Sequence, residues 1–166
     1  MKKVLIIVGT RPNFIKVTQF KRVAEEMGGV EIKIAHTGQH YDANMADVFF
    51  SQFGLHPDYF LEIGPSSPNT QMATIMLRLE ELIENKFRPD LLIVPGDVNS
   101  TFAAALTANK MGIKLAHLES GLRSLDRSMP EEINRVLTDE ISDHYFVTEQ
   151  SGLDNLSKEV KYGQVH

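Results

Sequence analysis

Near the start of the chain stands the segment Val4-Leu5-Ile6-Ile7-Val8-Gly9-Thr10-Arg11-Pro12. Its apolar run, residues 4–8, is rich in β-branched side chains and ends at a glycine, which predicts a first strand. Gly9 allows a ligand to approach the backbone closely, and Pro12 suits the first position of a helix. The run is too short for the core of a signal peptide or for a membrane span. We therefore expect a strand that leads directly into a helix.

The alternation of strand and helix continues along the chain. Apolar runs typical of strands recur at residues 30–35, 91–94, 113–118 and 145–147. Helical spacing of apolar residues marks the segments 14–27, 72–83, 101–111 and a last one opened by Pro130. Strands separated by helices imply parallel pairing with right-handed crossovers. The sequence thus predicts an α/β protein, a Rossmann-like three-layer α/β/α sandwich with a mainly parallel sheet. Loops are expected at 64–69 and 122–129, and residues 157–166 show no closing element.

Length and composition limit the class of protein. The 166 residues are 42% hydrophobic, which suits one domain over residues 1–166 with its own core. Cysteine is absent, so disulfides and thiolate metal sites are excluded, and a reducing, cytoplasmic location is compatible. The net charge of -5 disfavours a nucleic-acid binder, since phosphate backbones need a broad basic field. No membrane partner is expected either.

Three motifs follow strand-like runs: Gly9-Thr10-Arg11-Pro12, Gly96-Asp97 and His117-Leu118-Glu119. In an open parallel sheet, ligands bind beyond the carboxyl ends of the strands, where loops separate and helix N-termini point outward. Asp97 is equally a natural helix cap or turn residue, whereas Glu119 is not explained by strand alternation. Two carboxylates in one cleft would raise one another's pKa, which suits general acid/base chemistry. We interpret this edge as half of an active site.

Basic residues belong to the same edge. Arg11 lies beside the helix start, and the long side chain of Lys16 can reach back to it, so the two would clamp a phosphate or a sugar nucleotide. The alternative is that both are solvated surface residues. The chain has neither a dinucleotide-binding glycine pattern nor a Walker motif, so use of NAD or ATP is not indicated.

Several other polar residues have two interpretations. Glu131 and Glu132 stand in the first turn of a predicted helix, where acids are favoured whatever their function. Arg135 falls on the same helical face and would pair with one of them. His117 and His40 are more often hydrogen-bonded scaffolding than ligands, and their spacing from acids does not resemble a zinc site. No metal is therefore expected.

Taken together, the motifs resemble one known family, the non-hydrolysing UDP-N-acetylglucosamine 2-epimerases. Five segments occur in the family's order and span nearly the whole chain. They are Gly9-Thr10-Arg11-Pro12 with Ile15-Lys16, Thr37-Gly38-Gln39-His40, Gly96-Asp97, His117-Leu118-Glu119-Ser120-Gly121-Leu122-Arg123, and Met129-Pro130-Glu131-Glu132-Ile133-Asn134-Arg135. A single such segment would be a weak signal, but the ordered set is specific.

The resemblance implies a GT-B-like enzyme of two Rossmann-like domains with the active site between them. This chain resembles the N-terminal half, and the C-terminal UDP-binding domain, with the family's catalytic histidine, is absent from it, so the chain alone is expected to be inactive. In the family, UDP-N-acetylglucosamine and UDP-N-acetylmannosamine are interconverted at C2 by elimination and re-addition of UDP, through 2-acetamidoglucal. No cofactor or metal is implied, and a homodimer is expected for the full-length protein.

Site residues carried over position by position fall into two groups. The family's catalytic carboxylates match Asp97, Glu119 and Glu131, with the base and the acid not assigned individually. The positions that contact substrate match Arg11, Lys16, His40 and Arg135. The Thr37 to His40 segment also resembles a region through which some bacterial relatives use substrate as an effector.

Two departures keep other functions open. Val98-Asn99-Ser100-Thr101 stands where many members carry a threonine run, and Asn13-Phe14 stands where Glu-Ala is common. The substrate could therefore be a related UDP-sugar such as a diacetamido uronic acid. Further alternatives are a hydrolysing UDP-N-acetylglucosamine 2-epimerase, a retaining glycosyltransferase, and a non-catalytic nucleotide-sugar sensor or receiver-like domain.

Overall fold

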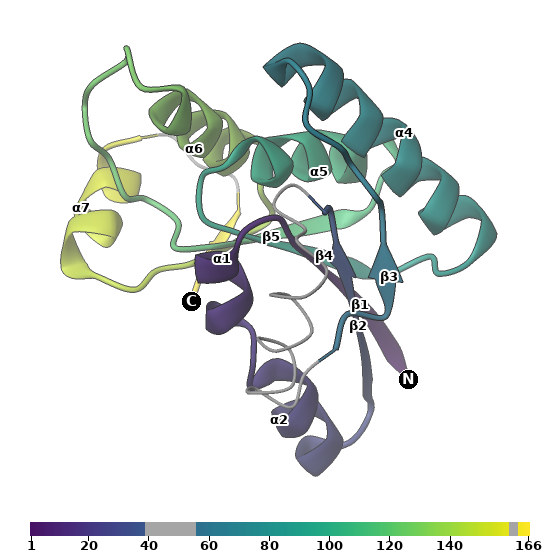
Figure 1. The fold of residues 1–166 in the computed structure, drawn as a ribbon. Coiled ribbons are helices and arrows are strands. Elements are labelled where there is room, and N and C mark those ends of the chain that lie inside the picture. The colour runs from purple at the N-terminus through teal and green to yellow at the C-terminus, as the bar shows by residue number, and fades with distance from the viewer. Residues whose placement is uncertain (39–55, 160–162) are drawn as a thin grey trace.

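The structure of the protein is a computed structural model that describes residues 1–38, 56–159 and 163–166. Within these residues, seven strands form one sheet in the order β3-β2-β1-β4-β5-β6-β7, and every neighbouring pair is parallel (Figure 1). The strands are β1 Lys2–Val8, β2 Val30–His36, β3 Tyr59–Phe60, β4 Leu91–Pro95, β5 Lys114–Leu118, β6 His144–Phe146 and β7 Gln164–Val165. The predicted parallel sheet is confirmed.

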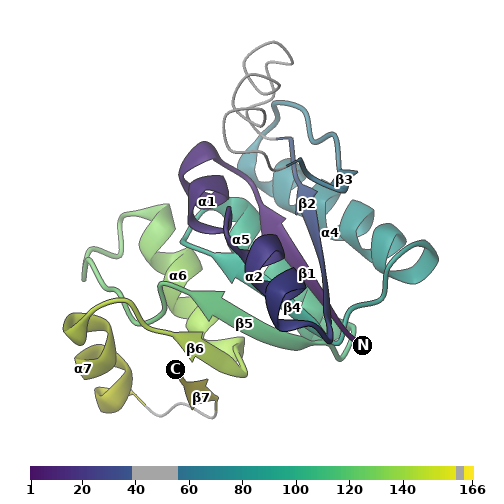
Figure 2. The ribbon, with the colours of Figure 1, turned by 90° about the horizontal axis from the view of Figure 1, so that it is seen from below.

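Helices cover both faces of this sheet. They are α1 Arg11–Lys16, α2 Phe20–Met27, α4 Pro68–Asn85, α5 Asn99–Lys110, α6 Pro130–Ile141 and α7 Gln150–Lys158. The two ribbon views place α1 and α2 on one face and α4, α5 and α6 on the other (Figures 1 and 2). The molecule is therefore a Rossmann-like three-layer sandwich, as the alternation of strands and helices predicts.

The core consists of two layers of apolar side chains separated by the sheet. Residues of β1 alternate between them: Leu5 and Ile7 pack in the cluster beneath α4 and α5, while Ile6 and Val8 pack in the cluster that contains Phe14. Because helices cover both faces, β1 is apolar at every position from 4 to 8 instead of alternating with polar residues. This double burial is why the first strand is so evident in the sequence.

The first predicted helix is two helices. Thr18 donates a hydrogen bond from its hydroxyl to the Ile15 carbonyl oxygen at 3.0 Å, and the backbone amides of Val17 and Phe20 bond carbonyls three residues earlier. Side-chain bonding of this kind competes with the helical hydrogen-bond pattern, so α1 ends and α2 begins anew. One consequence is that Met27, expected on the buried face, is 79% exposed.

The ends of two other segments also differ from expectation. Residues 68 and 69, predicted as loop, begin α4, because the Ser67 hydroxyl accepts from the amide of Thr70 and Pro68 takes a first-turn position. At the other end of the chain, the segment without a predicted closing element contains β7, whose Gln164 amide donates to the Asp143 carbonyl at 2.7 Å. Residues 122–129 form a loop, as predicted.

Gly9 is required by a contact within the protein. A Cβ at this position would lie 2.0 Å from the Oγ and 2.9 Å from the Cβ of Ser100, at the start of α5. The room that the sequence suggested for a ligand is therefore filled by the first turn of α5. Among the residues that the structure describes, none of the helices has the length and apolar character needed to cross a membrane.

Gly9→Ala should destabilise the fold by about 1–3 kcal/mol, because the added methyl group overpacks the contact with Ser100. Urea unfolding of the protein measures the change. Gly64→Ala is the matched control, since a Cβ at Gly64 meets no atom within 4 Å. Equal losses of unfolding free energy in the two variants would contradict this account of Gly9.

Candidate active site

Strand register brings the predicted motifs to one edge of the sheet. In the β4–β5 pair, Pro95 lies opposite Leu118, and the Gly96 amide donates to the Leu118 carbonyl at 3.1 Å. Asp97 and Glu119 therefore follow neighbouring strand ends, and Gly9-Thr10-Arg11 follows the end of β1 at the same edge. The placement of these motifs at the carboxyl ends of the strands is confirmed.

Glu119 is held in place by its backbone and by a lysine. Its φ of 67° is in the left-handed region, which is uncommon for a residue other than glycine, and its amide donates to the Phe146 carbonyl at 3.0 Å. The side chain accepts from Lys16 Nζ at 2.6 Å, with both side chains about a third exposed, at 28% and 32%. Lys16 thus reaches back from α1 to the strand edge, as expected.

Asp97 pairs with a different cation. Its carboxylate forms an ion pair with Arg135 of α6, and Asn134 donates to the Asp97 backbone carbonyl at 3.0 Å. The cap interpretation is wrong, because Val98 occupies the N-cap of α5 and Asp97 does not cap that helix. The two carboxylates thus face separate cations instead of crowding each other.

Glu132 completes the cluster from the start of α6. It accepts from the amides of Ser124 at 2.9 Å and Leu125 at 3.1 Å, and from Arg135 at 2.9 Å. Burial of the side chain opposes its ionisation, but the two amides and the Arg135 guanidinium outweigh this and lower the pKa of Glu132. The predicted pairing of Arg135 with an acid of its own helix is confirmed, with Glu132 as the partner.

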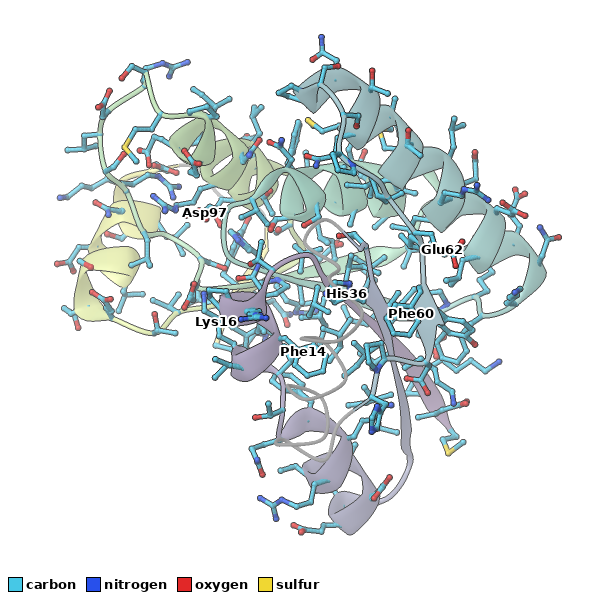
Figure 3. The ribbon with its side chains drawn as sticks, viewed as in Figure 1. Phe14, Lys16, His36, Phe60, Glu62 and Asp97 are labelled. Carbon is cyan, nitrogen blue, oxygen red and sulfur yellow. The ribbon has the colours of Figure 1, made fainter. Side chains whose placement is uncertain are left out.

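The cations of this site come from opposite faces of the sheet. Lys16 belongs to α1 and Arg135 to α6, which cover different faces, and both reach the edge where Asp97 lies (Figure 3, which labels Lys16 and Asp97). Carboxylates can accept and return protons, and cations beside them can bind a phosphate group.

The other predicted site residues are less closely joined to this cluster. Arg11 is exposed at the first position of α1, beside the strand edge. Glu131 is exposed in the first turn of α6, and within the described part of the chain its side chain makes no hydrogen bond or ion pair with Asp97 or Glu119. His40 lies outside the described residues.

His117 is a hydrogen-bonded structural residue, as the sequence predicts. The ring is fully buried, with Nδ1 2.6 Å from Asp139 Oδ1 and Nε2 2.7 Å from the Gly96 carbonyl oxygen. Asp139 also accepts from the Gly121 amide at 3.0 Å and from Arg123 at 2.7 Å. This network lies directly beneath the turns that carry Asp97 and Glu119.

Sequence reasoning gave Glu132 a structural role without separating it from Glu131, and it missed Asn134 and Asp139 as supports of the site. All three lie on one helix at positions 132, 134 and 139 and are buried, although they are polar. That combination is the signal that would have identified them: α6 carries acids and amides where an amphipathic helix normally places apolar side chains.

Glu132→Gln should destabilise the protein by about 1–3 kcal/mol at pH 7, because a charged acceptor of three hydrogen bonds is lost. The lowered pKa gives the sign of the pH dependence: the stabilisation is complete above the ordinary glutamate pKa of 4.5 and disappears as pH falls through the lower folded value. Urea unfolding at a series of pH values measures this. Glu131→Gln, at the exposed neighbouring residue, is the control. If the difference in unfolding free energy between Glu132→Gln and the unaltered protein grew as the pH was lowered, the structural role given to Glu132 would be wrong.

Comparison with known proteins places this arrangement in a family. A family model described as UDP-N-acetylglucosamine 2-epimerase matches residues 22–165. The UDP-N-acetylglucosamine 2-epimerase of Methanococcus maripaludis is 44% identical over 160 residues, which are 96% of this chain and 43% of that protein. The UDP-2,3-diacetamido-2,3-dideoxy-D-glucuronate 2-epimerase of Pseudomonas aeruginosa is 43% identical over 158 residues, 95% of this chain and 44% of that protein.

Solved structures agree with these sequences. The chain superposes with a TM-score of 0.91 and 40% identity on Methanocaldococcus jannaschii UDP-GlcNAc 2-epimerase in complex with UDP-GlcNAc and UDP, covering 99% of this chain and 45% of that one. This chain therefore spans under half the length of the relatives that it matches. Since the family model matches most of the sequence and the fold agrees, the chain belongs to the UDP-N-acetylglucosamine 2-epimerase family.

Proposed function

We propose that this chain forms the N-terminal domain of a non-hydrolysing enzyme that interconverts UDP-N-acetylglucosamine and UDP-N-acetylmannosamine. The observation that carries the proposal is the pairing of Glu119 with Lys16 and of Asp97 with Arg135 at one sheet edge, in a chain of this family. Carboxylates transfer protons, and cations beside them stabilise a departing pyrophosphate. Both requirements of the reaction are met by neighbouring groups.

The proposed reaction starts when a carboxylate removes the proton from C2 of the sugar. The electron pair forms a C1–C2 double bond, and the bond between C1 and the UDP oxygen breaks, giving 2-acetamidoglucal and UDP. A proton is then added to the opposite face of C2, and UDP adds back to C1. Substrate and product contain the same atoms, so the reaction needs a proton donor and acceptor and no external oxidant.

The roles proposed for individual residues follow from their chemistry. Carboxylates that can exchange protons with C2 are Asp97, Glu119 and Glu131. Groups proposed to bind the UDP-sugar are Arg11, Lys16, Arg135 and His40. In this structure Lys16 pairs with Glu119, and Arg135 pairs with Asp97. On substrate binding, each cation would be shared between its carboxylate and the pyrophosphate, which supports charge development on the leaving group.

We further propose that a second, UDP-binding domain closes over this edge in the full-length protein. Its support is that the matched relatives are more than twice as long as this chain. A homodimer, a cytoplasmic location and control by substrate through the region of His40 stay predictions.

A second sugar is supported by a specific observation. The relative named for the diacetamido-glucuronate is 43% identical and that named for UDP-N-acetylglucosamine 44%, so overall identity does not separate the two substrates. Both names are those of epimerases, which favours neither a hydrolysing enzyme nor a sensor. We propose the N-acetylglucosamine substrate first because it is also the one named by the family model.

Incubation of the full-length protein with UDP-N-acetylglucosamine in deuterium oxide should yield the manno epimer with deuterium at C2, because C2 is deprotonated and reprotonated. NMR and mass spectrometry detect both products. The same assay with UDP-2,3-diacetamido-glucuronate decides between the sugars. If neither deuterium nor epimer appears with the first sugar while the second reacts, the substrate assignment is wrong; release of free N-acetylmannosamine would identify the hydrolysing reaction.

Asp97→Asn and Glu119→Gln in the full-length protein should each lower kcat by about 10²–10⁴-fold, the range expected for loss of a general acid or base. Steady-state epimerisation rates measure the effect. Glu84→Gln is the matched control, because Glu84 is exposed on α4, a helix that contributes nothing to the ion pairs of Asp97 and Glu119. Near-normal kcat in both site variants would remove these residues from the mechanism.

A further inference from the structure

His117 occupies a position between the two turns that carry the proposed catalytic acids. It lies on β5, two residues before Glu119, and its Nε2 is 2.7 Å from the carbonyl oxygen of Gly96, the residue before Asp97. Its other ring nitrogen, Nδ1, is 2.6 Å from Asp139 Oδ1 on α6. One fully buried side chain therefore links two neighbouring strand ends to a helix of the covering layer.

The hydrogen-bond partners of the ring limit which of its nitrogens can donate. The Oδ2 atom of Asp139 accepts from the Gly121 amide at 3.0 Å and from the always-charged Arg123 guanidinium at 2.7 Å, which is the environment of an ionised carboxylate. Burial opposes this ionisation, but the contacts of the carboxylate outweigh it and lower the pKa of Asp139. An ionised carboxylate and a backbone carbonyl can only accept hydrogen bonds. Both ring nitrogens of His117 must then donate, which is possible only for the doubly protonated imidazolium.

The surrounding charges fit an imidazolium. Asp139 Oδ2 accepts from Arg123 at 2.7 Å, and Arg123 donates to both carboxylate oxygens of Glu159, at 3.1 and 2.9 Å. The chain His117, Asp139, Arg123, Glu159 thus alternates positive and negative groups and is neutral when the ring is charged. Buried charges persist when they are paired and hydrogen-bonded in this way.

The same network fixes the turn of Glu119. Ser120, the next residue, donates from Oγ to the His117 carbonyl at 2.6 Å, and the amide of Gly121 donates to Asp139 Oδ2 at 3.0 Å. Asp139 therefore anchors the loop after Glu119 with one oxygen and His117 with the other. The turns of Asp97 and Glu119 are tied to a single ion pair.

We propose that His117 is a positioning residue for the epimerisation: as a buried imidazolium bound to Asp139, it holds the Gly96 carbonyl and so keeps Asp97 in register with Glu119. The kinetic consequence rests on the function proposed above. His117 touches no substrate in this scheme and acts through the backbone of the turn that precedes Asp97.

The protonation state is tested without any assay of activity. Full-length protein labelled with ¹⁵N-histidine should show, at pH 7, protons on both ring nitrogens of His117, identified as the signals absent from His117→Gln and present in His144→Gln. Two protonated nitrogens support the proposal. A ring with one protonated nitrogen overturns it. If a variant fails to fold, backbone resonance assignment of the unaltered protein identifies the His117 ring signals instead.

Kinetics test the positioning role. The Gln side chain is uncharged and cannot donate to Asp139 and Gly96 together, so His117→Gln should lower kcat by about 10²-fold with KM little changed, the scale of loss expected from small misplacement of reacting groups. His144→Gln is the control, because His144 is on the neighbouring strand β6 and its ring contacts His166, not the turns of Asp97 and Glu119. A folded His117→Gln protein with normal kcat, or with only KM raised, overturns the proposal. An inactive unaltered enzyme with a doubly protonated ring would instead count against the proposed function alone.

Discussion

Parallel pairing of β4 with β5 is the constraint on which the site depends. Leu91 to Pro95 pair with Lys114 to Leu118 residue by residue, so both strands end at the same level and their next residues enter turns side by side. Asp97 and Glu119 therefore follow the ends of two strands that are direct hydrogen-bonded neighbours in the sheet. The cations come from helices on opposite faces of the sheet, Lys16 from α1 and Arg135 from α6.

The ion pairs of the site differ in how readily they can be exchanged. The side chains of Lys16 and Glu119 are about a third exposed, and exposed pairs contribute about 0–1 kcal/mol, so a phosphate can displace this pair at little cost. Arg135 is only 16% exposed and is held by Glu132 as well as by Asp97. Asp139 is fully buried with His117, and removing one partner of such a pair costs about 3–5 kcal/mol. The Lys16–Glu119 pair can therefore reorganise around a ligand while the buried pair of His117 and Asp139 holds the turns.

Much of the fold could be predicted because β1 and β4 are covered on both faces and are almost continuously apolar, while β5 is apolar apart from Lys114 and His117. The strands β3 and β7 were missed, since two residues each are too few to show a period. The break between α1 and α2 depends on one hydroxyl bond of Thr18, which apolar spacing does not reveal. In the site, the positions of Asp97 and Glu119 could be predicted from the strand ends. Their ion-pair partners could not, because Lys16 is 103 residues from Glu119 and Arg135 is 38 residues from Asp97 in the sequence.

The brevity of β3 and β7 also bears on what the borders of the sheet can offer to another β-segment. Within the residues that the structure describes, these strands form the two borders of the sheet, and each is two residues long. A border strand can recruit a foreign β-segment only along the length over which its amides and carbonyls stand in line. Within the described residues that length is a single repeat in β3 and in β7, so these two strands themselves offer little template for adding a foreign β-segment.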